Sequence, residues 1–166
     1  MNNFSKLRIG NGVDFHKFAN EEGKFLLPIG GIKIPFYKKI LAHSDGDVLL
    51  HSLCDAIFGS LANGNIGTHF PPSDDKWKNA NSIIFLEYAI NELKKKGGTI
   101  INIDSTIICE EPKIMPHVPK MKEIISKICN LEIAQISIKA VTTEKMGFLG
   151  NKEGVACLTN ILTMLA

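Results

Sequence analysis

The sequence predicts an α+β domain built around one β-sheet, and two observations lead to this prediction. Segments with strand periodicity and segments with helix periodicity are interspersed, but they do not alternate as strictly as in parallel α/β folds. The chain has 166 residues, the usual length of one domain with one core. We therefore expect a single domain over residues 1–166, with no second domain fused to it.

Strands are predicted where apolar residues alternate with polar ones or where β-branched residues gather. Gly30-Gly31, placed between two apolar runs, is typical of a hairpin turn. The segment at 154–165 is ambiguous, but its alternation favours a strand over a helix. The predicted strands are 6–17, 25–29, 32–35, 99–109, 136–141 and 154–165.

Helices are predicted where apolar residues recur every three to four positions. In the first of them, Asp47, His51 and Asp55 are spaced four apart and form a polar line beside an apolar stripe. Residues 63–79 have the glycine and proline content of a loop, and a loop this long is more often functional or mobile than idle. The predicted helices are 47–60, 82–96 and 119–129.

Composition argues against several classes of function. The net charge of +2 is too small to attract nucleic acid or a membrane surface. No apolar stretch is long enough to cross a bilayer, and residues 1–6 lack the apolar core of a signal peptide, so we expect them to form a flexible tail. The cysteines form no Cys-x-x-Cys pair and are expected to be reduced and mostly buried in a cytoplasmic protein. They are Cys54, Cys109, Cys129 and Cys157.

Asp14, His16 and His51 are the strongest candidates for a functional site. Asp14 and His16 are two apart on a predicted strand and therefore point to the same face, while Phe15 points to the other. His51 lies one to two turns inside the first predicted helix. One carboxylate and two imidazoles without a nearby thiolate suit a catalytic zinc ion that keeps a coordination position open. Such a protein would be a metal-dependent enzyme acting on an oxygen-rich, phosphorylated substrate.

Each of these features also has an ordinary structural interpretation. An Asp-x-His pair can lie on the solvated face of a strand. Asp45 or Asp47, near a serine and a glycine, could cap the helix that follows. Asp55 could be a solvated helix residue, and His43 could be an ordinary loop histidine. Spacing alone does not prove that the three candidate side chains meet.

Three further segments could serve a phosphorylated substrate. Lys113, in a proline-stiffened loop after a strand, could pair with phosphate or be a solvated turn residue. Thr142, Thr143 and Glu144 end another predicted strand. Their oxygens could hold phosphate groups and a hard cation such as Mg²⁺, or they could cap a helix. Phe148, in a glycine-framed turn, could serve an interface.

Five motifs follow one another along nearly the whole chain, from about Arg8 to the C-terminus. They are RIGNGVDFH (8–16), LAHSDGDVLLH (41–51) with Asp55, NIGTHFPPSD (65–74), PKIMPH (112–117) and TTEKMGF (142–148). In their order and spacing, they resemble the 2-C-methyl-D-erythritol 2,4-cyclodiphosphate synthase family, which belongs to the methylerythritol phosphate route to isoprenoids. Five ordered motifs are far more specific than any single one.

The resemblance implies a homotrimer of single α+β domains, each with one mixed β-sheet packed against helices, and three active sites at the subunit interfaces. The implied enzyme is a phosphorus–oxygen lyase whose substrate is 4-diphosphocytidyl-2-C-methyl-D-erythritol 2-phosphate. Its 2-phosphate would attack the β-phosphorus of the diphosphate and CMP would leave. The product would be 2-C-methyl-D-erythritol 2,4-cyclodiphosphate. No nucleic-acid or membrane partner is expected.

The resemblance also implies two metal ions. One Zn²⁺ per subunit would bind Asp14, His16 and His51, and a Mg²⁺ or Mn²⁺ ion bridging the diphosphate would bind Glu144. Attack of one phosphate on another suffers charge repulsion, which the cations would neutralise. Zinc would act as a Lewis acid and template rather than as an activator of water.

Other catalytic roles follow from the same resemblance. His43 and Thr142 match positions assigned to transition-state stabilisation, and Lys113 would lie near phosphate. Because the nucleophile is already anionic, we expect Asp47 and Asp55 to orient the imidazoles rather than to move protons. The residues expected to contact the substrate, including the loop for the erythritol part (65–74) and the cytidine pocket (109–115), are Asp14, His16, His43, Ser44, Asn65, Ile66, Gly67, Phe70, Asp74, Cys109, Pro112, Lys113, Ile114, Met115, Ala140, Val141, Thr142, Thr143, Glu144, Phe148 and Asn151.

The chain departs from the family pattern at three asparagines. Asn65 stands where an Asp usually contacts the erythritol hydroxyls, so substrate affinity is in question. Asn11 stands where a His is common. Asn151 stands where many relatives carry an Arg that lines the central trimer cavity and is associated with a prenyl diphosphate, although Lys152 could substitute for it. We therefore expect weak or absent prenyl diphosphate binding.

Two other functions remain open from the sequence. A zinc-dependent phosphoesterase would activate water at the same site and release linear phosphates. A non-catalytic trimer that binds a nucleotide or a prenyl diphosphate would keep its function without His51. The expected location is the cytoplasm, or a plastid-type organelle if the source is a eukaryote.

Overall fold

The computed structural model describes residues 3–166. The predicted flexible tail at residues 1–6 therefore lies partly outside the described residues. The remainder of that segment, Asn3–Lys6, forms one turn of 3₁₀-helix that leads directly into the first strand. Among the described residues, no helix combines the length and the apolar character that crossing a bilayer requires.

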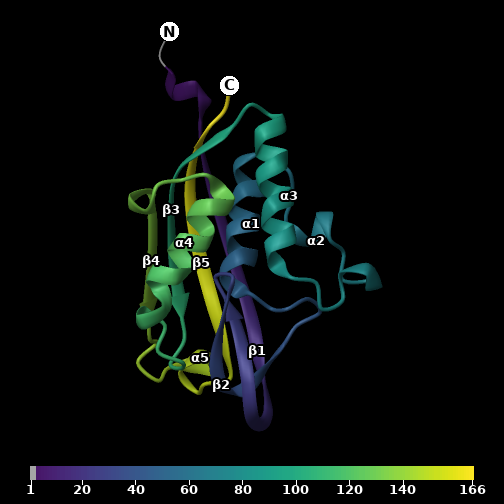
Figure 1. The fold of residues 1–166 in the computed structure, drawn as a ribbon, viewed down its shortest axis with the longest axis vertical. Helices are drawn as coiled ribbons and strands as arrows, with labels where there is room; N and C mark the ends of the chain where they lie inside the picture. Colours follow the sequence, from purple (N-terminus) through teal and green to yellow (C-terminus); the bar gives the residue numbers. More distant parts are fainter. Residues whose placement is uncertain (1–2) are drawn as a thin grey trace.

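The strands form one mixed sheet, as predicted, and the described residues contribute five strands to it rather than the six predicted (Figure 1). The strand order is β2-β1-β5-β3-β4, with β5 at the centre between β1 and β3. Within residues 3–166, the β3–β4 pair is parallel and the other three pairs are antiparallel. The ambiguous C-terminal segment is β5, which confirms the strand prediction. The strands are β1 (Leu7–Ile29), β2 (Ile32–Leu41), β3 (Thr99–Ile108), β4 (Ile136–Val141) and β5 (Gly154–Met164).

The first two predicted strands are parts of one long strand, β1, which corrects the sequence prediction. The polar run between them stays in the strand because the register with β2 shifts between Phe18 and Glu22 and again between Glu22 and Phe25. The predicted hairpin is confirmed: Gly30 and Gly31 both have positive φ, at 64° and 78°, as the tightest hairpin turns require.

Helices cover one face of the sheet (Figure 1). The three predicted helices are confirmed as α1 (Val48–Ser60), α3 (Ser82–Lys95) and α4 (Val118–Cys129). The predicted loop at 63–79 holds a short helix, α2 (Ile66–His69), and a 3₁₀ turn, Asp75–Trp77. One more short helix, α5 (Gly147–Gly150), precedes β5.

Helix α1 is the centre of the core and is held unusually close to β1. It packs on β1 and β5 and also against α3. A Cβ atom added to Gly12 would lie 1.9 Å from the carbonyl oxygen of Ser52, and one added to Gly10 would lie 1.8 Å from that of Ala56. Only glycine permits this approach, which brings the next residues of β1 on the same face beside the side chains of α1.

The opposite face of the sheet is open in the single chain. Ile9, Val13 and Phe15 of β1 point to it and are 77%, 44% and 55% exposed. On the same face, the side-chain amide of Asn11 donates a hydrogen bond to the side-chain oxygen of Asn160, at 2.8 Å. An apolar face of this kind is typical of a surface that another chain covers.

Candidate functional site

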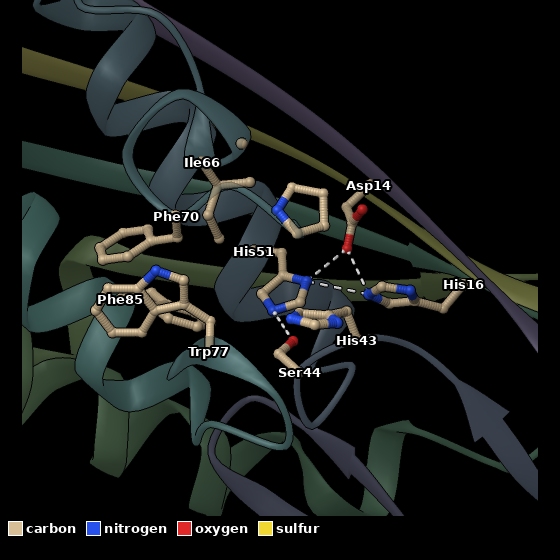
Figure 2. A pocket seen from close by; sticks show the side chains of 11 residues that line it. Asp14, His16, His43, Ser44, His51, Ile66, Phe70, Trp77 and Phe85 are labelled. Carbon is tan, nitrogen blue, oxygen red and sulfur yellow. Dashed lines mark hydrogen bonds and ion pairs between the residues drawn. The ribbon is translucent and has the colours of Figure 1, made fainter. Parts of the chain in front are cut away.

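Asp14, His16 and His51 meet beside one pocket, as the sequence predicted (Figure 2). Asp14 and His16 project from β1 on the face that α1 covers, and His51 projects from α1. The Oδ2 atom of Asp14 lies 2.9 Å from Nε2 of His16 and 3.0 Å from Nδ1 of His51. The two imidazole nitrogens are 3.0 Å apart. Three potential ligand atoms therefore form a small triangle.

The triangle has the chemistry and nearly the dimensions of a zinc site. Zinc bonds to nitrogen and oxygen ligands are about 2.0–2.1 Å long, so neighbouring ligands of a tetrahedral ion are about 3.3 Å apart. The three atoms here need to separate by only a few tenths of an ångström. Two imidazoles and one carboxylate are a common ligand set for catalytic zinc, and they leave a fourth position for substrate or water. The residues present thus fit such an ion.

Electrostatics also favour a cation between these side chains. Burial would raise the pKa of Asp14, but hydrogen bonds with His16 and His51 outweigh burial and hold that pKa well below its usual range. For His51, burial acts to lower the pKa, yet the hydrogen bond to Asp14 gives a net increase. Both shifts have the same cause, since the carboxylate stabilises positive charge at this position.

The other nitrogen of His51 faces residues that sequence reasoning did not single out. Nε2 of His51 lies 2.8 Å from Oγ of Ser82 and 3.2 Å from Oγ of Ser44. Ser82 is the first residue of α3, and both its backbone N–H and its hydroxyl contact the carboxylate of Asp45. No local pattern marks Ser82, because only the packing of α3 beside the loop before α1 brings it to His51.

Asp47 and Asp55 do not hold the imidazoles, so that prediction was wrong. The carboxylate of Asp47 accepts hydrogen bonds from the backbone N–H groups of Gly30, Gly31 and Leu50. It therefore caps α1, as its alternative interpretation proposed, and also ties the helix to the β1–β2 turn. Asp55 accepts a hydrogen bond from the backbone N–H of Ile66, at 2.6 Å. Its role in the structure is to anchor α2.

A pocket of about 220 Å³ opens beside the three candidate ligands. Predicted site residues that line it, besides the ligands, are His43, Ser44, Ile66, Gly67 and Phe70. Phe70 packs with Trp77 and Phe85, at ring distances of 4.9 and 4.5 Å, to form an aromatic wall (Figure 2). Pro72, from the predicted loop at 65–74, also lines the pocket, as do Trp77 and Phe85, which were not predicted to do so. Asp74 is exposed outside this lining, with its backbone oxygen 3.4 Å from the His43 ring.

Asn65, which was expected to contact the substrate, caps α2. Its side-chain oxygen accepts hydrogen bonds from the backbone N–H and the hydroxyl of Thr68, at 3.0 and 2.9 Å. Asn65 is exposed, and its amide nitrogen could still donate to a ligand. With Asp55 holding Ile66, this cap fixes the loop at the mouth of the pocket.

The predicted cytidine and phosphate residues form a second pocket, of about 460 Å³. It lies between the loop after β3 and the end of β4. Predicted site residues that line it are Cys109, Pro112, Lys113, Ile114, Met115, Ala140, Val141 and Thr142. The first pocket and this one share no lining residue. Within one chain, the predicted site residues that line a pocket are therefore divided between two pockets, and the others line neither.

Thr142 and Glu144 lie at the end of β4, on a turn that Glu110 holds. The Thr142 hydroxyl donates to Oε1 of Glu144, at 2.7 Å. Oε1 of Glu110 accepts hydrogen bonds from the backbone N–H groups of Thr143 and Lys145, at 3.0 and 3.3 Å. Glu144 is exposed and does not belong to the group of potential metal ligands. A metal ion there would need further ligands from the substrate.

Phe148 and Asn151 line neither pocket, and Phe148 lies beside the open face of the sheet. The ring of Phe148, 55% exposed, is 6.2 Å from that of Phe15. Asn151 is exposed, and the ammonium group of Lys152 pairs with Glu111, at 2.8 Å. Because Lys152 already pairs with Glu111, the structure does not support the expectation that Lys152 substitutes for an Arg at position 151.

Comparisons with known proteins agree with the geometry. Residues 7–164 match the model of the YgbB family. The chain belongs to the YgbB family. A protein of Anaplasma phagocytophilum named 2-C-methyl-D-erythritol 2,4-cyclodiphosphate synthase is 54% identical over 90% of this chain and 89% of its own length. The resemblance seen in the five motifs is thereby confirmed.

Solved structures of similar proteins have the same fold. IspF of Plasmodium falciparum, solved as a CDP complex, superimposes with a TM-score of 0.85 at 38% identity, covering 98% of both chains. The bifunctional IspDF of Campylobacter jejuni gives a TM-score of 0.90 at 39% identity; the match covers 96% of this chain but only 42% of that one. The α+β fold with one mixed sheet is thus shared with the whole of the first structure and with part of the second.

Proposed function

We propose that this protein converts 4-diphosphocytidyl-2-C-methyl-D-erythritol 2-phosphate to 2-C-methyl-D-erythritol 2,4-cyclodiphosphate with release of CMP, as a metal-dependent phosphorus–oxygen lyase. The observation that carries the proposal is the convergence of Asp14, His16 and His51 beside a pocket in a chain of the YgbB family. The names of the curated relatives and the CDP complex of a similar structure support the same reaction.

The residues of the first pocket suit the ring closure. Zinc, when bound to the three ligands, would supply a Lewis acid and a template for the phosphates. His43 and Ser44 place polar groups beside the ligands, while the aromatic wall around Phe70 limits access of water. Holding both ends of the substrate in one site makes the attack of phosphate on phosphate effectively unimolecular. Excluding water protects the product-forming step from hydrolysis.

The second pocket would hold the cytidine diphosphate part. Its walls combine apolar side chains such as Ile114 and Met115 with the ammonium group of Lys113 and the hydroxyl of Thr142. Lys113 would neutralise phosphate charge at the leaving group, and Thr142 would donate to a phosphate oxygen. Glu144, beside Thr142, would hold Mg²⁺ or Mn²⁺ together with the diphosphate.

A complete site requires residues from two subunits in this proposal. The two pockets of one chain share no lining residue, although the reaction needs both groups of residues around one substrate. The open sheet face with Ile9, Val13 and Phe15 offers an apolar surface for assembly. We therefore propose a homotrimer in which the first pocket of one subunit faces the second pocket of the next. We call the first pocket, beside Asp14, His16 and His51, the metal pocket, and the second, around Lys113 and Thr142, the nucleotide pocket. The bacterial relatives of this protein support a cytoplasmic location.

Phosphorus NMR tests the proposed reaction directly. The purified protein, loaded with zinc, is incubated with the diphosphocytidyl substrate and Mg²⁺, with and without a zinc chelator. We expect the signals of a cyclic diphosphate and of CMP to appear together, and the chelator to suppress both. Linear phosphates as the products would instead identify a phosphoesterase that activates water at the same site. No turnover, with tight nucleotide binding, would identify a non-catalytic protein.

A further inference from the structure

We propose that Ser82 and Asp45 are positioning residues that set the tautomer of His51, so that its Nδ1 lone pair faces the metal position. The inference deepens the proposed function, because it concerns the metal ligands of the same site. Ser82, Asp45 and His51 come from the start of α3, the loop before α1 and the first turn of α1, respectively. We call these three side chains the relay.

The direction of each hydrogen bond in the relay follows from counting protons. A carboxylate has only acceptor positions, whereas a serine hydroxyl has one proton to donate. The hydroxyl of Ser82 contacts Oδ1 of Asp45 and must donate to it, since two oxygen lone pairs would otherwise face each other. Oδ2 of Asp45 accepts the backbone N–H of the same serine, at 3.0 Å, which fixes the carboxylate in place.

With its proton committed to Asp45, Ser82 can only accept from His51. The 2.8 Å contact therefore requires that Nε2 of His51 carries a hydrogen. Ser44 lies slightly farther from the same nitrogen, at 3.2 Å. In the neutral imidazole, a hydrogen on Nε2 leaves the lone pair on Nδ1, and Nδ1 is the atom 3.0 Å from both Asp14 and His16. The relay thus prepares the ligand atom before a metal arrives.

Burial makes this arrangement specific. Ser82 is fully buried and His51 is only 6% exposed, so water cannot easily replace a missing partner. Partners of this kind usually affect the affinity of a metal site, because they fix both the ring orientation and the tautomer of the ligating histidine. Asp47 and Asp55, which lie on the same helix face as His51, make no such contact.

Zinc affinity tests the relay without the use of substrate. We expect Ser82→Ala and Asp45→Asn each to weaken zinc binding about 10- to 100-fold, measured by competition with a chromophoric chelator. Ser60→Ala is the matched control. Ser60 is also buried, and its hydroxyl donates only to the carbonyl oxygen of Ile57, at 2.8 Å. The control should bind zinc as tightly as the unmodified protein.

NMR of the unmodified, zinc-loaded protein keeps the test decisive even if a variant does not fold. With ¹⁵N-labelled histidine, we expect a slowly exchanging Nε2–H signal for His51 and faster exchange in Ser82→Ala. Zinc affinities of Ser82→Ala and Asp45→Asn equal to that of the unmodified protein would overturn the relay, as would zinc bound to Nε2 of His51. Neither measurement involves turnover, so failure of the relay and failure of the proposed reaction are distinguishable.

Discussion

Replacement of His51 by alanine is expected to abolish tight zinc binding and to slow CMP release by about a thousandfold or more. The change removes one of the three proposed ligands, and the remaining pair, Asp14 and His16, offers too few donors to hold the ion against water. A Lewis acid at the reacting phosphates supplies several kcal/mol of transition-state stabilisation, and each 1.4 kcal/mol corresponds to about a tenfold change in rate.

Zinc content and CMP release are measured on the same preparations. Because His51 is buried, its truncation could also loosen the core, so His51→Gln serves as a second variant that keeps most of the side-chain volume. His117→Ala is the control: this histidine is half-buried at the start of α4 and lines neither pocket. We expect the control to keep its zinc. A His51→Ala protein with full zinc content and turnover would contradict the proposed site.

Two inactive variants are expected to regain activity when their subunits are mixed. His51→Ala damages the metal pocket and Lys113→Ala damages the nucleotide pocket, so each variant alone should be slow. If a site combines the metal pocket of one subunit with the nucleotide pocket of the next, some sites in a mixed trimer receive two intact halves. With random, equal mixing, each of the two pockets that form a site comes from an intact copy in about half of the cases. About one quarter of the sites are therefore complete.

Mixing is done by co-expression or by joint refolding, and activity is compared with that of the unmodified protein. The control mixes His51→Ala with a chain that carries both changes; no site in that mixture can be complete. Recovery in the first mixture alone shows that the two pockets work across a subunit boundary. Absence of recovery, with normal mixed assembly, would mean that both pockets of one chain serve the same substrate.

Much of the fold could be predicted because its local patterns are strong. The three long helices and the Gly30-Gly31 turn follow directly from apolar periodicity and glycine placement. The continuous strand β1 could not be predicted, because its polar middle has the composition of a loop. It stays in the strand only because the pairing with β2 shifts register there. Similarly, α2 is only four residues long and depends on Asn65 and Asp55, which cap and anchor it.

In the candidate site too, contacts set by local spacing could be predicted, whereas contacts set by tertiary packing could not. Asp14 and His16 share a face because they are two apart on a strand, and the motifs that contain them resemble one family. The relay through Ser82 depends on how α3 packs beside the loop before α1. The contact between Ser82 and His51 therefore cannot be predicted from spacing in the sequence. Helical spacing placed Asp47 near His51. The carboxylate of Asp47 instead accepts hydrogen bonds from the backbone N–H groups of Gly30 and Gly31, in the β1–β2 turn.

The central claim is that one cation binds Asp14, His16 and His51 together. Anomalous X-ray scattering at the zinc absorption edge, from crystals of the zinc-loaded protein, tests this claim most directly. We predict one strong peak per chain, within bonding distance of Oδ2 of Asp14, Nε2 of His16 and Nδ1 of His51. Zinc bound elsewhere, or these three atoms without a shared peak in fully loaded protein, would contradict the claim.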